Sequence, residues 1–319
     1  MLRKLGIVGL AVPLVAIIAA LIYLFLFGET EPTFEDATQQ LAQDHTVYGL
    51  DLEGRPAALV APFGADPTRP LPLIIALHGY GSNVWEHSLY LGLIGRISVD
   101  RFLLLMPNGS RDEDGNRFWN ATEFCCDFGD SNINDVEYLG SLLDEASQLV
   151  DIGPVYAVGH SNGGFMSFRL ACDGLPGLRG IVSLAGTTFA DEQRCADAEP
   201  VSILQIHGDA DDVIRYDGAE YPGAPETVMR WARHLGCDFN AAETLPDLDL
   251  EPGRQRDDTR VVRYRQGCAD GATVEHWRIA GGSHDPAFDS ESIGESIVAW
   301  LFEADQRSRA TGQPLLHCP

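Results

Sequence analysis

Residues 155–164 read VYAVGHSNGG, and this stretch decides the fold class that the sequence predicts. It contains the pattern Gly-x-Ser-x-Gly, which carries little weight alone because glycine and serine are common residues. Its context is specific, because residues 155–158 form a strand-like apolar run before it and residues 164–171 have helical periodicity after it. A strand, a sharp turn bearing a serine and a helix together form a nucleophile elbow. Glycines are needed there because the strained turn leaves no room for Cβ atoms.

A nucleophilic serine requires two partners elsewhere in the chain. Its hydroxyl attacks poorly until a base removes the proton, so a histidine and an orienting acid are needed. Residues 207–213 read HGDADDV directly after the apolar run 201–206. Asp211 holds the acid's place in this loop, while Asp209 and Asp212 are alternatives whose other explanation is turn or capping chemistry.

The base is predicted in a later loop. Residues 281–284 read GGSH after the strand-like run 274–279, so His284 lies in a flexible loop from which it can reach back to the serine. The other histidines end strands, lie within the elbow or lack a motif. The predicted catalytic residues are therefore Ser161, Asp211 and His284.

Acyl transfer also needs backbone N–H groups directed at the oxyanion. Asn162, directly after the serine, supplies one of them. The loop 78–82, which reads HGYGS after an apolar run, supplies the other from Tyr80. We expect Tyr80 and His160 to contact the substrate. Trp119 is a further candidate for substrate contact, and a structural role is the favoured explanation for it.

The rest of the sequence alternates between strand-like and helix-like segments. Short apolar runs typical of strands buried on both faces occupy residues 71–77, 102–106, 155–158, 180–184 and 201–206. Helical periodicity occupies residues 133–150, 164–171, 225–235 and 290–302. Residues 46–52 and 55–61 predict a hairpin at a sheet edge, and the acidic residues 238–259 predict a surface insertion. This alternation predicts an α/β fold with a mostly parallel central sheet flanked by helices.

Taken together, these motifs resemble the bacterial polyhydroxybutyrate depolymerase-like esterases, a family that includes feruloyl and acetylxylan esterases. The resemblance spans roughly residues 46–303 and is carried by residues 77–81 (LHGYG), 118–122 (FWNAT), 125–126 (CC), 134–136 (NDV), 159–164 (GHSNGG), 207–213 and 281–284. It implies an α/β-hydrolase fold and carboxylic ester hydrolysis, with Ser161, Asp211 and His284 at the positions of the triad. Residues 285–287 (DPA) replace the Trp-Pro-Gly found after the histidine in many members, which leaves the pocket wall and the substrate open.

The N-terminal segment predicts a transmembrane helix. Residues 6–27 form an uninterrupted apolar run, long enough at about 1.5 Å per residue to cross a hydrocarbon core of about 30 Å. Basic residues before it and acidic residues after it place the following domain outside the cytoplasm. Secretion after signal cleavage is the alternative. The predicted organisation is a cytoplasmic N-terminus (1–5), a transmembrane signal-anchor (6–27), an acidic linker (28–45), an α/β-hydrolase domain (46–303) and a C-terminal tail (304–319).

The seven cysteines fit an oxidising compartment outside the cytoplasm. Cys237 and Cys268 flank the acidic insertion and form the first predicted disulfide; Cys172 with Cys195 is the second. Cys318 is the expected free thiol. No cysteine or histidine spacing matches a zinc site, so we expect no metal.

Charge excludes one class of partner. The chain has 22 Lys and Arg against 47 Asp and Glu, a formal charge of −25, and therefore repels nucleic acid. The densest group of arginines lies among acids and predicts a solvated face: Arg254, Arg256, Arg260, Arg263 and Arg265.

The motifs predict a membrane-anchored serine esterase that needs no cofactor. Its substrates are expected to be hydroxyalkanoate-type, feruloyl or acetyl esters, as small molecules or on a polymer. The alternatives are an acyltransferase that uses the same triad, or an inactive hydrolase-fold protein that binds a ligand at the cell surface. The sequence leaves the oligomeric state open.

Overall fold

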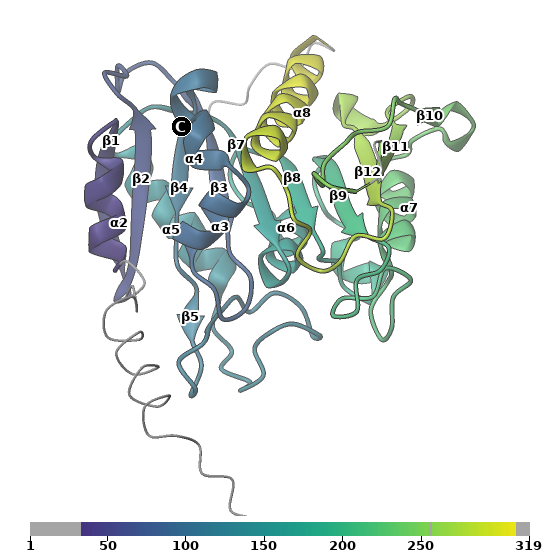
Figure 1. The fold of residues 1–319 in the computed structure, drawn as a ribbon, viewed down its shortest axis with the longest axis horizontal. Helices are drawn as coiled ribbons and strands as arrows, with labels where there is room; N and C mark the ends of the chain where they lie inside the picture. Colours follow the sequence, from purple (N-terminus) through teal and green to yellow (C-terminus); the bar gives the residue numbers. More distant parts are fainter. Residues whose placement is uncertain (1–32, 255–256, 311–319) are drawn as a thin grey trace, which may run out of the picture.

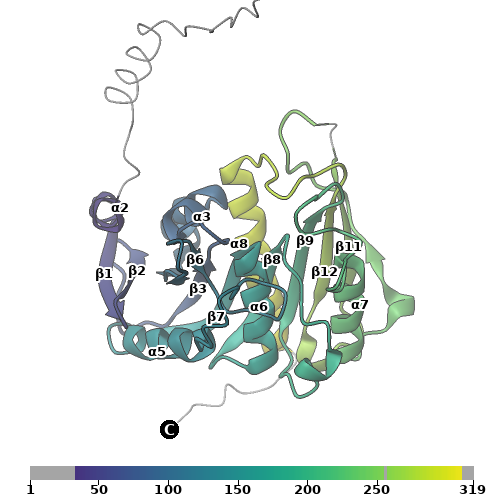
Figure 2. The ribbon, with the colours of Figure 1, turned by 90° about the horizontal axis from the view of Figure 1, so that it is seen from below.

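The computed structural model describes residues 33–254 and 257–310, and within them a ten-stranded sheet lies between two layers of helices (Figures 1 and 2). Its strands are β1 (His45–Leu52), β2 (Arg55–Pro62), β3 (Leu71–Leu77), β4 (Leu103–Met106), β7 (Ile152–His160), β8 (Leu178–Leu184), β9 (Ser202–Gly208), β10 (Glu243–Thr244), β11 (Thr259–Tyr264) and β12 (Val274–Ile279). They are ordered β1-β2-β4-β3-β7-β8-β9-β12-β11-β10. Strands β4 to β12 in this order run parallel, and antiparallel strands border them on both edges. The predicted mostly parallel sheet and the edge hairpin are confirmed.

Helices cover both faces of this sheet (Figure 2). One layer contains α5 (Asp135–Ser147), α6 (Asn162–Asp173) and α7 (Ala224–His234). The other contains α3 (Val84–Tyr90), α4 (Leu93–Arg96) and α8 (Ser290–Ala310), with α2 (Phe34–Leu41) beside the β1–β2 hairpin. A short hairpin of β5 (Ser110–Arg111) and β6 (Arg117–Phe118) projects from the carboxyl end of the sheet.

The sequence of strand β3 is continuously apolar because both of its faces are covered. Leu73, Ile75 and Leu77 pack against the layer of α5, α6 and α7, whereas Ile74 and Ala76 pack against the layer of α3 and α8. All five side chains are fully buried. A strand covered on both faces has no polar alternation, which is why the run 71–77 could be recognised as a central strand.

Two predicted boundaries differ from the structure. The expected linker 28–45 contains α2, which Thr33 caps at its N-terminus and which buries Ala37 and Leu41 against the hairpin. Helix α8 also continues past residue 303, the predicted end of the domain. The predicted transmembrane segment 6–27 lies outside the described residues. Among the residues that are described, no helix is long and apolar enough to cross a membrane.

The acidic insertion is part of the sheet rather than a purely surface feature. Strand β10 lies within residues 238–259 and pairs with β11, which extends the sheet beyond β12. Leu250 and Glu251 of the insertion are buried. Arg263, expected on a solvated face, is mostly covered and forms an ion pair with the buried Glu275. The sequence pattern hid β11 because it contains two arginines, of which Arg260 is exposed and Arg263 pairs with Glu275 and Glu303 on neighbouring elements.

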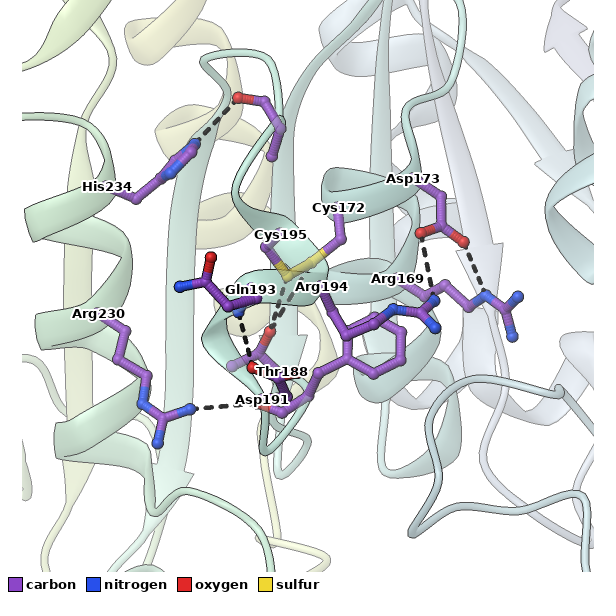
Figure 3. Close-up of a disulfide and its surroundings, with 12 residues drawn as sticks. Arg169, Cys172, Asp173, Thr188, Asp191, Gln193, Arg194, Cys195, Arg230 and His234 are labelled. Carbon is purple, nitrogen blue, oxygen red and sulfur yellow. Dashed lines mark hydrogen bonds and ion pairs between the residues drawn. A yellow bond between two sulfur atoms is a disulfide. The ribbon is translucent and has the colours of Figure 1, made fainter.

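Three disulfides join cysteines of the described residues. Cys237–Cys268 and Cys172–Cys195 are present as predicted. Figure 3 shows the second of these, which ties the end of α6 to the short helix η2 (Glu192–Cys195). A third, which the sequence analysis did not predict, joins the neighbours Cys125 and Cys126. Cys318 lies outside the described residues.

We expect Gly163→Ala to destabilise the fold. A Cβ atom at Gly163 would lie 1.8 Å from the carbonyl oxygen of Leu77, a backbone atom that cannot move without shifting β3. The expected loss in free energy of unfolding is about 3 kcal/mol, measured by urea denaturation. Gly140→Ala in α5 is the matched control, because a Cβ there meets nothing closer than 4.0 Å and should stabilise the helix by about 0.5–1 kcal/mol. Equal stability of the two variants would contradict this account of the packing.

Candidate active site

Ser161 lies at the turn between β7 and α6 with φ 53° and ψ −120°. A positive φ is uncommon for a residue with a side chain and persists only where the surroundings hold it. Here the Ser161 N–H donates to the carbonyl oxygen of Leu184 at 2.8 Å. A Cβ at Gly159 would lie 2.0 Å from the carbonyl oxygen of Gly163, so strand and helix approach closely on either side of the turn.

The structure brings Ser161, His284 and Asp211 into one hydrogen-bonded line. His284 Nε2 lies 2.9 Å from Ser161 Oγ, and His284 Nδ1 lies 2.8 Å from Asp211 Oδ2. A carboxylate only accepts, so Nδ1 carries the proton and Nε2 accepts from the serine hydroxyl. Of the two alternative acids, Asp209 instead accepts from the Gly281 N–H at 2.6 Å, and Asp212 is exposed.

Asp211 is buried and strongly hydrogen-bonded. Its Oδ1 accepts from the N–H groups of Val213 and Ile214, both at 2.9 Å. Its Oδ2 also lies 3.2 Å from His207 Nε2. Burial acts to raise the pKa of Asp211, but the hydrogen bonds from His207 and His284 outweigh it and hold the pKa well below its usual range. The carboxylate therefore stays ionised at neutral pH.

The loop that carries His284 is held at several points, although the sequence analysis expected it to be flexible. Five hydrogen bonds join its backbone to the acidic insertion, the loop after β9, the elbow and α3. They are Ala280 N–H to Asp258 O and Ala287 N–H to Glu251 Oε1, Gly281 N–H to Asp209, His160 Nε2 to His284 O, and Tyr90 hydroxyl to Pro286 O. Glu251 belongs to the acidic insertion and is buried. Burial and the nearby His284 lower the pKa of His160 to about 4, so its imidazole is neutral at pH 7 and donates from Nε2.

Two backbone N–H groups adjoin the serine. Asn162 is the first residue of α6, so its N–H has no partner within the helix. A Cβ at Gly79 would lie 3.4 Å from the Cβ of Ser161, so the loop 78–82 passes against the serine one residue before Tyr80. The N-terminus of α6 further favours negative charge at this position.

A cavity of about 310 Å³ opens beside Ser161. It is lined by Gly79, Tyr80, Ser82, Glu86, His87, Tyr90, His160, Ser161, His284 and Asp285. The expected substrate contacts Tyr80 and His160 line it. Trp119 does not line it, because its side chain is fully buried, which favours the structural role over substrate contact. The sequence analysis missed Glu86, His87 and Tyr90, which lie on α3 without any motif to mark them.

A second cavity of about 270 Å³ lies beside the Cys172–Cys195 disulfide and shares no lining residue with the first (Figure 3). Its charged groups are already paired. Arg230 contacts the carboxylates of Glu226 and Glu192 and donates to the carbonyl oxygens of Phe189 and Ala190. This cavity therefore offers no unpaired charge to a ligand.

Comparison with known proteins gives relatives in one class. No family model matches the chain. "Putative esterase NocK" from Nocardia uniformis subsp. tsuyamanensis is 30% identical over 254 residues, which cover 73% of this chain and 69% of NocK. "Feruloyl esterase D" from Neurospora crassa is 29% identical over 163 residues, 50% of each chain. "Feruloyl esterase C" from Emericella nidulans is 30% identical over 175 residues, 52% of this chain and 58% of the relative. The chain thus spans about half the length of these two feruloyl esterases.

Solved structures show the same fold at low sequence identity. A thermostable esterase has a TM-score of 0.55 at 14% identity, covering 83% of this chain and 64% of its own. The acetyl xylan esterase from Aspergillus awamori has a TM-score of 0.57 at 12% identity, covering 81% of this chain and 99% of its own. At such identities the likeness concerns the arrangement of sheet and helices alone.

We expect the stability of the protein to fall in mild acid because several histidines, including His78, His87, His160 and His276, are wholly or mostly buried in the neutral form. Burial lowers the pKa of His78 to about 4, and burial together with the nearby His160 lowers that of His87 to about 3. In the unfolded chain these groups titrate near 6.5, so below that pH unfolding takes up protons. Each should contribute a loss of up to about 1.4 kcal/mol per pH unit between pH 6.5 and 4.

Urea denaturation at pH 7, 5.5 and 4.5 measures this dependence. His87→Gln should make it less steep by the share of one histidine, because glutamine cannot take up a proton. A free energy of unfolding that is constant between pH 6.5 and 4.5 would contradict the assignment of neutral buried histidines.

Proposed function

The chain belongs to the feruloyl esterase-like family of α/β-hydrolase enzymes and is a carboxylic ester hydrolase, and we propose that it acts through a triad of Ser161, His284 and Asp211. The observation that carries the proposal is the pair of hydrogen bonds at 2.9 Å and 2.8 Å that joins the three side chains. A serine at a strained elbow has no structural need for such partners. The arrangement is what nucleophilic catalysis by serine requires.

The proposed reaction has two halves. In the first, Ser161 Oγ attacks the ester carbonyl while its proton passes to His284 Nε2, and Asp211 stabilises the imidazolium. The N–H groups of Tyr80 and Asn162 hold the oxyanion. His284 then gives its proton to the departing alcohol and leaves an acyl-enzyme. In the second half, His284 takes a proton from water, the resulting nucleophile attacks the acyl-enzyme, and the carboxylic acid leaves as the proton returns to Ser161.

For the substrate, we propose an ester without additional negative charge, of the feruloyl, acetyl or short hydroxyalkanoate type. Glu86 and Asp285 line the cavity, and none of the lining residues that the structure describes is a lysine or arginine. Anionic groups are therefore disfavoured there. At the rim, the exposed Phe128 lies against Tyr80 with ring centroids 5.4 Å apart, which offers an aromatic surface to a planar group.

For the compartment, we propose that the enzyme works outside the cytoplasm, anchored by residues 6–27 or secreted after their removal. Three disulfides among the described residues favour an oxidising environment. The anchor itself lies outside the described residues and rests on the apolar run in the sequence.

The triad is tested with p-nitrophenyl esters of increasing chain length. We expect Ser161→Ala to abolish turnover, and His284→Gln and Asp211→Asn to lower kcat by about 10³-fold or more, because the serine proton loses its acceptor or the imidazole its orientation. Asp212→Asn is the control for all three variants. Asp212 follows Asp211 in the same loop, and its variant should keep wild-type kcat.

Two outcomes would contradict the triad. One is turnover retained in folded Ser161→Ala, and the other is no turnover by the wild type together with no labelling of Ser161 by a fluorophosphonate. Addition of an alcohol acceptor distinguishes hydrolysis from acyl transfer, because transfer yields a new ester instead of the free acid.

The aromatic rim is tested by Phe128→Ala. We expect KM for a feruloyl ester to rise by about three- to tenfold, since about 0.5–1.5 kcal/mol of ring contact is lost. KM for an acetyl ester, which has no ring, should not change. Steady-state kinetics on the two esters measures the difference, with Phe63→Ala, another exposed phenylalanine, as control. An equal effect on both esters would rule out a subsite for the ring.

A further inference from the structure

The side chain of Asn162 is not available to a substrate. It is fully buried, and both of its polar atoms are bonded to the backbone of Trp119. The Trp119 N–H donates to Asn162 Oδ1 at 2.7 Å, and Asn162 Nδ2 donates to the Trp119 carbonyl oxygen at 2.9 Å. This two-point contact fixes the first residue of α6, whose own N–H is one of the proposed oxyanion donors.

The indole of Trp119 holds the other side of the site. Its Nε1–H donates to the carbonyl oxygen of His78 at 3.0 Å. The His78 ring is fixed as well, because Nδ1 lies 2.8 Å from the carbonyl oxygen of Gly79 and Nε2 accepts from the Gly109 N–H at 2.9 Å. The loop that begins at His78 carries the Tyr80 N–H, the second proposed oxyanion donor.

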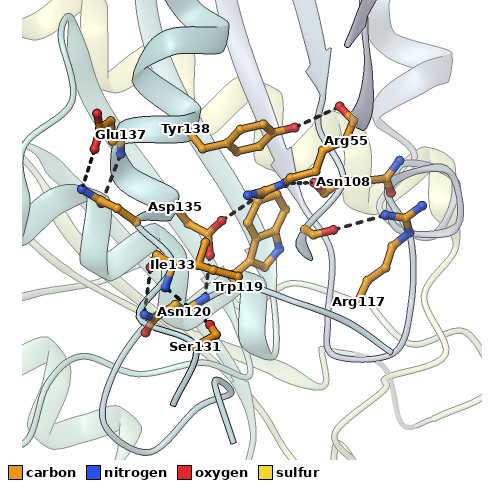
Figure 4. Close-up of polar contacts among 12 residues, drawn as sticks. Arg55, Asn108, Arg117, Trp119, Asn120, Ser131, Ile133, Asp135, Glu137 and Tyr138 are labelled. Carbon is orange, nitrogen blue, oxygen red and sulfur yellow. Dashed lines mark hydrogen bonds and ion pairs between the residues drawn. The ribbon is translucent and has the colours of Figure 1, made fainter. Parts of the chain in front are cut away.

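Trp119 is in turn anchored by a buried ion pair (Figure 4). Asp135 Oδ2 accepts from the Asn120 N–H at 2.7 Å, and Asp135 Oδ1 accepts from Arg55 at 2.8 Å. The Arg55 guanidinium stacks on the ring of Tyr138 at 3.3 Å and faces the ring of Trp119 at 5.6 Å. Burial raises the pKa of Asp135, and the Arg55 charge opposes that rise. Both side chains are buried, so each buried charge has its partner.

We propose that Trp119 is a positioning residue that links the two halves of the oxyanion hole, with its backbone on Asn162 and its indole on His78. This inference rests on the proposed function. Oxyanion donors stabilise a transition state only when they point at the developing charge before the reaction, so a shift of either amide weakens catalysis more than substrate binding. The Asp135–Arg55 pair holds Trp119 through the Asn120 N–H and the face of the indole.

The test is Trp119→Phe in the full-length protein, which keeps the ring but removes the indole N–H. We expect kcat for a p-nitrophenyl ester to fall by about 10- to 100-fold, less than the 10²- to 10³-fold loss typical of deleting a donor. Affinity for a boronic acid that forms a tetrahedral anion on Ser161 should fall by the same factor. KM should change by less than about twofold.

The matched control is Trp277→Phe. Trp277 is also buried, and its indole donates to Glu275 at 2.7 Å, so the variant loses the same kind of hydrogen bond in another place. We expect a similar fall in melting temperature but wild-type kcat and boronate affinity. If the two variants lose activity equally, Trp119 acts only through general stability and the inference is wrong.

Asn162→Ala removes the contact between Asn162 and Trp119 at the Asn162 side chain. It tests the inference even if Trp119→Phe does not fold. It removes both bonds to Trp119 while keeping the N–H at residue 162, and we expect the same paired fall in kcat and boronate affinity. Wild-type values for kcat and boronate affinity in this variant overturn the inference. Ser161→Ala, measured in parallel, tests the proposed function alone. If this variant keeps its turnover, the proposed triad is wrong regardless of the result for Trp119.

Discussion

The close approach of α6 to the ends of β3 and β7 is the constraint on which the rest of the site depends. Ser161 occupies a positive φ between them, and the backbone around Gly159 and Gly163 is so tightly packed that a Cβ at either position would overlap neighbouring backbone atoms. This packing sets the direction of the serine side chain, the N-terminus of α6 and the distance to the loop after β3. The turn keeps its strained backbone conformation because packing of the surrounding sheet and helix stabilises it by more than the strain costs.

Buried polar groups then hold the surrounding loops in a single arrangement. Asp211 is fixed by two backbone N–H groups and faces His284. The His284 loop is held by His160, Tyr90 and Glu251, which come from the elbow, from α3 and from the acidic insertion. Each of these groups is hydrogen-bonded to the backbone of the loop that it orders. A preorganised site of this kind does not need to rearrange when charge develops on the substrate.

Local patterns predicted the parts of the fold that depend on neighbouring residues in the chain. The run 71–77 matches β3, and the alternation around residues 53–54 matches the turn between β1 and β2. Local patterns were insufficient where distant contacts decide the outcome. Trp119 was a candidate for either a structural role or substrate contact, and long-range contacts favour the first, because its indole reaches His78 and its backbone meets Asn162. Strand β11 was hidden because its polar sequence did not reveal its pairing with β12 or the ion pair of Arg263 with Glu275.

By itself, the sequence determined the fold class, the serine turn and the residues from which a triad is proposed, because each depends on a short motif and on the order of strands and helices. Only the tertiary structure decided which groups hold those residues in place. The Asn162–Trp119 contact joins segments 43 residues apart, and the bond from Glu251 to Ala287 joins segments 36 residues apart. No local preference of either segment encodes such a contact, since it exists only when packing of the sheet and helices brings the two backbones together.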